Sequence, residues 1–286
     1  MVNIMKLEYI CEKDMLLKEY LVYLGLSRRF CKRIKLYGKM MINGNISLNF
    51  YPVHVGDKIT LEYDEKINDD ILVQKEELDI AYEDDHILVV NKRYNLATQP
   101  SRKHYYNNLV SIVKGYFEDQ GLNTNIHVVN RLDYATSGLM VIAKDGFTHH
   151  ALTKEKNINR YYYALVAGII ENNEGVIDLP IRRCSDDTIK REVGSGGKKA
   201  ITNYEVVKRD FDLQRTLVKI KLETGRTHQI RVHFAYLGYP LVGDALYNPN
   251  YNNEERLYLH SYKVEFINPY SNELICLENK PDFYDK

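Results

Sequence analysis

An acidic stretch from Asp64 to Glu77 constrains the fold of this chain most, because it separates two segments of different pattern. The segment before it contains helix and turn signals, whereas the longer segment after it is rich in strand-like runs. At 286 residues, the chain is longer than one hydrophobic core usually requires. The pattern predicts a small domain over 1–66, an acidic linker over 67–77 and a larger domain over 78–286.

Composition narrows the class of protein. Hydrophobic residues make up 44% of the chain, which is enough for buried cores, and no apolar run is long enough to cross a membrane. The cysteines are scattered, which argues against a metal site and fits a reduced, cytoplasmic location. Lys plus Arg and Asp plus Glu both number 39, so only the local distribution of charge can indicate a nucleic-acid partner.

The first segment concentrates positive charge on a predicted helix. Leucines at helical spacing end at Gly25, a second helix is expected up to Gly38, and Asn43-Gly44 predicts a hairpin. The candidate phosphate-binding residues on and after the second helix are Arg28, Arg29, Lys32, Arg33 and Lys39. From the residues alone, this basic face could equally be an ordinary solvated surface.

Residues 14–63 resemble an S4 domain, a small RNA-binding module. The matching residues are Leu17, Leu21, Leu26-Ser27-Arg28, Lys39, Ile42-Asn43-Gly44 and Gly56-Asp57-Lys58-Ile59. The resemblance implies that RNA is the partner, without saying which RNA.

The second segment predicts a mixed α+β domain with a mostly antiparallel sheet. Strands are expected over 87–90, 139–143, 161–167, 202–207 and 213–222, and helices over 109–117 and 147–153.

Two polar segments interrupt this pattern. Asn130-Arg131-Leu132-Asp133 forms a turn before an apolar strand, where a carboxylate can meet a ligand or merely form a local salt bridge. In Gly225-Arg226-Thr227-His228-Gln229-Ile230-Arg231-Val232-His233, Thr227 is expected to cap a helix that ends near Gly238. His228 and Arg231 then share one face, whereas His233 lies on another, so a metal site is not expected here.

Together with Arg160-Tyr161-Tyr162-Tyr163-Ala164-Leu165-Val166 and Arg256-Leu257-Tyr258-Leu259-His260, these segments closely resemble the RluA-type family of pseudouridine synthases. The similarity extends from Ile80 to Pro269. This chain departs from the family pattern at two places: Asn130 stands where the family often has His, and Arg93-Tyr94-Asn95 follows Lys92 in place of a more usual turn. Neither place includes the catalytic Asp, so we expect an effect on substrate choice and not on activity.

The resemblance implies a cofactor-free enzyme that isomerises uridine in structured RNA, with large-subunit ribosomal RNA favoured over transfer RNA. Asp133 would be the catalytic carboxylate, Arg226 its ionic partner, and Tyr162 the ring that stacks on uracil. Arg131 would fill the base stack or contact phosphate. The further substrate-binding residues would be Thr136, His228, Arg231 and Leu259. A monomer is the working expectation.

Two other functions remain open at this level. A non-catalytic RNA-binding or ribosome-assembly factor would keep the first domain and use the second as a binding surface. A hydrolytic glycosidase would generally need a second carboxylate about 5 to 10 Å from the first.

Overall fold

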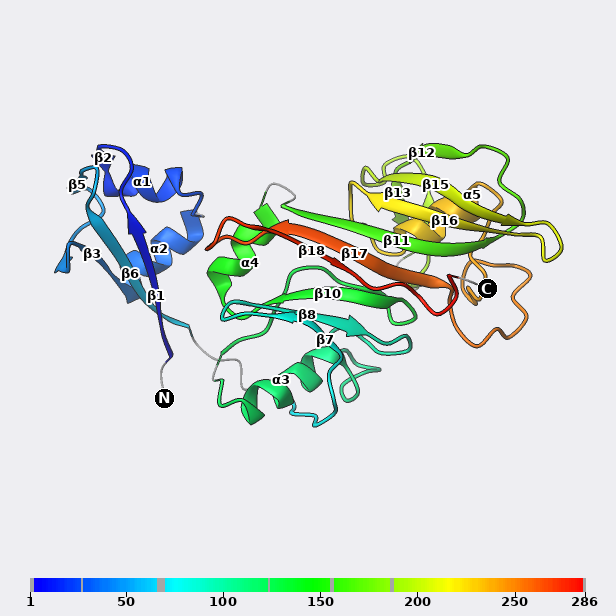
Figure 1. The fold of residues 1–286 in the computed structure, drawn as a ribbon, viewed down its shortest axis with the longest axis horizontal. Helices are drawn as coiled ribbons and strands as arrows, with labels where there is room; N and C mark the ends of the chain where they lie inside the picture. The colour runs from blue at the N-terminus through cyan, green and yellow to red at the C-terminus, as the bar shows by residue number, and fades with distance from the viewer. Residues whose placement is uncertain are drawn as a thin grey trace.

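The computed structural model describes residues 3–26, 28–65, 70–122, 124–154, 157–185 and 188–284 (Figure 1). Within these residues, the chain forms a four-stranded N-terminal sheet, a ten-stranded sheet and two two-stranded ribbons. None of the helices in these ranges is long and apolar enough to span a membrane.

The N-terminal sheet is antiparallel, with the strand order β1-β6-β3-β4. Its core includes Leu21 from the first helix, Ile34 from the second and Leu61 from the sheet. The predicted hairpin is confirmed, because Asn43 and Gly44 both have positive φ, 52° and 82°. The elements are β1 (Asn3–Ile10), β2 (Met15–Leu16), α1 (Leu17–Tyr23), α2 (Arg28–Tyr37), β3 (Gly38–Ile42), β4 (Asn45–Ile46), β5 (Pro52–Val53) and β6 (Lys58–Glu65).

The start of this region differs from the sequence-based expectation. No strand was predicted before the first helix, yet β1 pairs with β6 along its full length. It is an edge strand in which apolar Ile10 occupies an exposed position, which breaks the alternation of polar and apolar residues that would signal a strand. Ser27, quoted for the S4 resemblance, lies outside the described residues.

The predicted linker over 67–77 lies in part outside the described residues, at 67–69. Its described part, 70–77, contains no helix or strand, but it is bonded to α3 (Leu109–Asp119). The Gln74 amide donates to the Ser111 carbonyl at 3.0 Å, and Lys75 pairs with Asp119 at 2.5 Å. This part is therefore fixed to the C-terminal domain and does not cross solvent as a free connector.

The large sheet has the order β12-β15-β16-β11-β17-β10-β8-β7, with β18 beside β17 and β9 beside β10. All of its described pairings are antiparallel except β10 with β17, so the expected α+β fold is confirmed. Its strands are β7 (Ile80–Glu83), β8 (Ile87–Lys92), β9 (His127–Val128), β10 (Ser137–Ala143), β11 (Ile158–Ala167), β12 (Glu174–Asp178), β15 (Ile201–Asp210), β16 (Arg215–Leu222), β17 (Leu259–Ile267) and β18 (Leu274–Glu278). A separate ribbon joins β13 (Ile181–Arg183) to β14 (Arg191–Val193).

Alternation along the strands divides the core between the two faces of this sheet. Met140 and Ile142 pack with α3 and with α5 (Gln229–Tyr236) on one face. Leu139 and Val141 pack on the other face with Leu152 of α4 (Gly146–Thr153). The strands and helices predicted for this domain are confirmed, whereas the short strands at its periphery and β17 were not predicted.

The two domains meet at α4 (Figure 1). Phe147 belongs to the N-terminal core cluster, and its ring meets the Tyr9 ring edge-on at 6.2 Å between centroids. His150 Nε2 also lies 3.1 Å from the Gly25 carbonyl oxygen. The contact combines apolar burial with a hydrogen bond across the boundary.

Gly138 allows the parallel contact between β10 and β17. Its φ is 112°, and a Cβ at this position would lie 2.3 Å from the Ser261 carbonyl oxygen. This close approach of two backbones holds the turn before β10 next to Leu259, the first residue of β17.

We therefore expect Gly138→Ala to lower the free energy of unfolding by roughly 2 to 5 kcal/mol, because left-handed strain and a backbone clash add together. Gly238→Ala is the matched control, since Gly238 has φ 86° but, apart from its chain neighbours, no atom of the described residues lies within 4 Å of its Cβ position. It should cost about 1 to 2 kcal/mol from strain alone. Urea denaturation measures both values, and equal losses would contradict this explanation.

Candidate functional site

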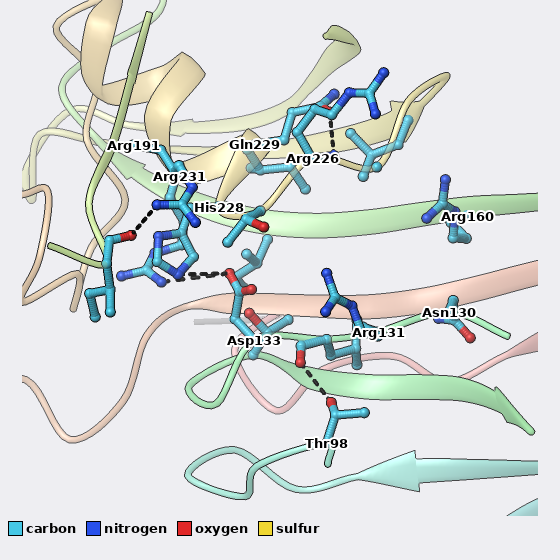
Figure 2. Close-up of a pocket in the computed structure, with 18 of the residues that line it drawn as sticks. Thr98, Asn130, Arg131, Asp133, Arg160, Arg191, Arg226, His228, Gln229 and Arg231 are labelled. Atoms are coloured by element: carbon cyan, nitrogen blue, oxygen red, sulfur yellow. Dashed lines mark hydrogen bonds and ion pairs between the residues drawn. The ribbon is translucent and has the colours of Figure 1, made fainter. Parts of the chain in front are cut away.

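A cavity of about 1190 Å³ lies between the turn before β10, the start of α5 and the β13–β14 ribbon (Figure 2). Among its described lining residues, six are arginines and Asp133 alone is acidic. The arginines are Arg131, Arg160, Arg183, Arg191, Arg226 and Arg231. This excess of positive charge suits a ligand that carries several negative charges.

The turn that carries Asp133 is fixed by hydrogen bonds on both sides. The Thr98 hydroxyl donates to the Leu132 carbonyl oxygen at 2.7 Å, and the Thr136 amide donates to that of Asp133 at 3.1 Å. Asn130 Oδ1 accepts from the amide of Val141 on β10 at 2.7 Å. Asn130, where the resembled family often has His, thus anchors the turn to the sheet.

Arg231 is the ionic partner of Asp133. Its Nη1 lies 3.6 Å from Asp133 Oδ2, and the Asp133 side chain is 28% exposed, so it can still meet a ligand. The same guanidinium forms two hydrogen bonds with the fully buried Asp244, at 2.8 and 2.7 Å. Bidentate pairing of this kind fixes the guanidinium plane as well as its position.

The expected pairing of Arg226 with Asp133 is wrong in this structure. Arg226 is exposed, donates from Nε to the Lys199 carbonyl oxygen at 2.9 Å and extends away from Asp133 in Figure 2. It precedes α5, whereas Arg231 is the third residue of the helix and lies on the face toward Asp133. Arg226 still lines the cavity.

The start of α5 also differs from the expected Thr227 cap. His228 precedes the helix in a left-handed conformation, φ 58°, which is uncommon for a residue with a side chain. Gln229 Oε1 accepts from the Arg226 amide at 2.9 Å and from the Thr224 hydroxyl at 2.8 Å. Among the described residues, no side chain caps the helix, and the Gln229 side chain instead holds the loop that precedes it.

This backbone turns the His228 ring toward Asp133, with Nε2 3.9 Å from Oδ2. Nδ1 lies 2.8 Å from the Tyr247 hydroxyl oxygen, which accepts the Arg191 amide at 2.9 Å. The hydroxyl hydrogen is thus free to donate to Nδ1, which leaves the ring proton on Nε2. Burial lowers the pKa of His228 and keeps the ring neutral at pH 7.

Tyr247 supports both residues that contact Asp133. Its ring also lies under the Arg231 guanidinium, 5.0 Å from centroid to Cζ. Burial raises the pKa of Tyr247 to about 12, so the hydroxyl stays protonated. No sequence signal singled Tyr247 out among 24 tyrosines.

The cavity has an apolar inner wall. Tyr162 and Leu259 are 4% and 3% exposed, pack in the same core cluster and line the cavity. Burial raises the pKa of Tyr162. Two polar atoms of the lining, Thr136 Oγ1 and Arg160 Nε, are buried without a hydrogen-bond partner among the described residues. Buried polar atoms normally have partners, so these two are available to a ligand.

The predicted RNA-binding residues of the first domain lie apart from the residues that line this cavity. Arg28, Lys32 and Arg33 are exposed on α2, and exposed Lys39 on β3 lies 4.0 Å from Glu62. The side chain of Arg29 lies outside the described residues. Their role stays a prediction.

A second network fixes the C-terminal segment to the turn that carries Asp133. Ser137 Oγ lies 2.8 Å from His260 Nδ1, and His260 Nε2 donates to the Asn279 carbonyl oxygen at 3.0 Å. Arg256 donates to Ser137 and pairs with Asp282 at 2.8 Å. Burial lowers the pKa of His260 to about 4.

We expect this lowered pKa to make the protein less stable in acid. The unfolded imidazole, with a pKa near 6.5, takes up a proton that the folded ring does not, so stability falls as pH drops below 6.5. The His260 contribution amounts to roughly 2 kcal/mol between pH 7 and pH 5. Urea denaturation at both pH values should show His260→Gln losing this dependence, with exposed His54→Gln retaining it. An unchanged dependence in His260→Gln would contradict the assignment.

Known proteins match the part of the chain that carries Asp133 and Arg231. The family described as RNA pseudouridylate synthase matches residues 86–236. The uncharacterized RNA pseudouridine synthase YjbO of Bacillus subtilis is 39% identical over 264 residues, which is 91% of this chain and 93% of that protein. Ribosomal large subunit pseudouridine synthase D of Pseudomonas aeruginosa is 38% identical and covers 73% of this chain and 66% of its own length.

Two further proteins extend the comparison. The dual-specificity RNA pseudouridine synthase RluA of Vibrio cholerae is 38% identical, over 72% of this chain and 84% of its own. The solved structure of human RNA pseudouridylate synthase domain containing 1 superposes with a TM-score of 0.62 at 26% identity, over 73% of this chain and 85% of that one. The resemblance drawn from the motifs is thereby confirmed: this chain belongs to the RluA-type family of RNA pseudouridine synthases, enzymes that isomerise uridine to pseudouridine.

Proposed function

We propose that this enzyme isomerises specific uridines of large-subunit ribosomal RNA and that Asp133 is its catalytic carboxylate. The observation that carries the proposal is the single cavity carboxylate held against Arg231, which is in turn held by buried Asp244. The choice of RNA rests on the name of the Pseudomonas relative, and transfer RNA is the second choice.

The target nucleotide has to leave the RNA helix to reach this site. Flipping a base costs a few kcal/mol, which contacts with the extruded nucleotide and its phosphates must offset. The arginines around the cavity supply such contacts, and Arg131, beside Asp133 in Figure 2, is placed to fill the gap in the base stack or to bind a phosphate. Leu259 forms an apolar wall of the pocket for the base, and the Tyr162 ring stacks on the base.

The reaction breaks the bond between N1 of uracil and C1′ of ribose and forms a bond from C5 to the same C1′. The proton on C5 is lost and N1 gains one, so no electrons enter or leave. Arg231 pairs with Asp133, whose carboxylate can either attack C1′ or remove a ribose proton. Beside Asp133, two groups can donate hydrogen bonds to the substrate. They are the Thr136 hydroxyl, which has no partner among the described residues, and the Nε2 proton of His228.

The cations predicted in the first domain, Arg28, Arg29, Lys32, Arg33 and Lys39, are proposed to bind RNA phosphates away from the cavity, as the S4 resemblance implies. We propose a monomer that acts in the cytoplasm. The rival glycosidase reaction is disfavoured because Asp244, the other carboxylate paired with Arg231, is buried and already accepts two hydrogen bonds from Arg231.

Pseudouridine mapping tests the proposal. An unmodified large-subunit ribosomal RNA transcript is incubated with the enzyme, labelled with carbodiimide and read by primer extension. We expect new stops with the wild-type enzyme and none with Asp133→Asn, which keeps the side-chain shape but removes the charge. RNA binding without new stops by either protein would favour the binding-factor alternative, and release of free uracil would favour the glycosidase.

Tyr247→Phe tests the support behind Asp133. The variant keeps the ring under Arg231 but removes the hydroxyl that orients His228. We expect kcat to fall about tenfold, or about 1.4 kcal/mol, with little change in KM. Tyr116→Phe is the matched control, because it breaks a 2.6 Å hydrogen bond to Glu83 away from the cavity. Equal kcat values for the two variants would show that the hydroxyl has no part in turnover.

A further inference from the structure

The loop between β8 and α3 is anchored next to the cavity. The Leu109 amide donates to the Ala97 carbonyl oxygen at 2.8 Å, which closes the base of the loop, and Thr98 bonds the turn that carries Asp133. Pro100 and Ser101 line the cavity. The loop therefore starts at the cavity wall and projects from it.

Internal hydrogen bonds give this loop a defined shape. The amide and carbonyl groups of Ser101 and His104 bond to each other at 3.0 and 3.4 Å, which forms a tight turn. Asn108 Nδ2 donates to the carbonyl oxygens of His104 and Tyr105 at 3.3 and 3.2 Å. A ligand binding here would not have to order the loop first.

The two residues at the tip of this turn are cations. Arg102 and Lys103 are exposed and have no ion pair among the described residues. The sequence from Ala97 to Leu109 contains no acidic residue. The tip therefore presents uncompensated positive charge, as a phosphate-binding surface does.

Exposed aromatic rings follow the cations. Tyr105 and Tyr106 are 53% and 72% exposed, and their rings are perpendicular, with centroids 5.4 Å apart. His104 stacks at 4.7 Å on Tyr134, the neighbour of Asp133, which is itself 44% exposed. Each exposed ring offers a face on which a nucleobase can stack.

We propose that residues 101–106 bind the single-stranded nucleotides that adjoin the target uridine. Arg102 and Lys103 contact their phosphates, and Tyr105 or Tyr106 stacks on a base. The inference rests on the proposed function, because it takes RNA as the substrate, and it adds a binding surface outside the catalytic cavity. Stacking is worth about 1 to 3 kcal/mol per base, comparable to the cost of flipping the uridine.

The aromatic part is tested by kinetics on an unmodified large-subunit ribosomal RNA transcript. Combining Tyr105→Ala with Tyr106→Ala should raise KM about tenfold or more, while the single-turnover rate at saturating enzyme changes little. Phe at both positions should recover most of the lost affinity, since the rings remain. Tyr236→Ala removes an exposed tyrosine at the far end of α5 and should leave KM unchanged.

The cationic part is tested by salt dependence. Binding of a short fluorescent oligouridylate is measured over a range of salt concentrations for the wild type and for Arg102→Gln combined with Lys103→Gln. Two lost phosphate contacts should reduce the slope of log affinity against log salt by about 1.4. Lys208→Gln, at an exposed site on β15, is the control and should keep the wild-type slope.

The loop and the proposed function fail in different ways. Unchanged KM for the alanine pair and an unchanged salt slope for the glutamine pair, with normal pseudouridine formation, would overturn the loop proposal alone. If the wild-type enzyme makes no pseudouridine, the proposed function fails, and oligouridylate binding by the alanine and glutamine pairs still decides whether the loop binds RNA.

Discussion

The site depends on one chain of charges, Asp133 to Arg231 to Asp244. A guanidinium buried in this way would be costly without partners, and the fully buried Asp244 accepts two short hydrogen bonds from it. Arg231 thereby stands at a fixed point of the cavity, and the partly exposed Asp133 takes its orientation from it. A preorganised charge of this kind needs no rearrangement when the substrate arrives.

The rest of the structure brings Asp133 and Arg231 together. The close contact at Gly138 sets the turn that carries Asp133 against β17, and the left-handed His228 starts α5 so that His228 and Arg231 face the carboxylate. Tyr247 contacts both of these residues, because its hydroxyl lies next to His228 Nδ1 and its ring lies against the Arg231 guanidinium. His228 and Arg231, more than ninety positions after Asp133 in the sequence, therefore both lie next to its carboxylate. The arginines around the cavity suit a phosphate-rich substrate.

Local patterns predicted much of this, and long-range contacts account for the misses. His228 and Arg231 lie on the same side and face Asp133, but His228 precedes α5 in a left-handed conformation, so helical periodicity does not account for its position. The Asn43-Gly44 hairpin follows from turn chemistry alone. The choice between Arg226 and Arg231 as the partner of Asp133 does not, because it depends on where α5 begins. That start is set by Gln229, whose side chain also donates to Ile201 on β15, a contact that no local pattern contains. Tyr247 was missed for the same reason.

A crystal structure of the enzyme bound to RNA with 5-fluorouridine at a mapped position would test the central claim most directly. We predict that the fluorinated nucleotide is extruded into the cavity, that its ribose lies next to Asp133, and that Arg231 is still bound to both Asp133 and Asp244. A nucleotide that stays stacked in the RNA, or an Asp133 paired with Arg226 in the complex, would contradict it.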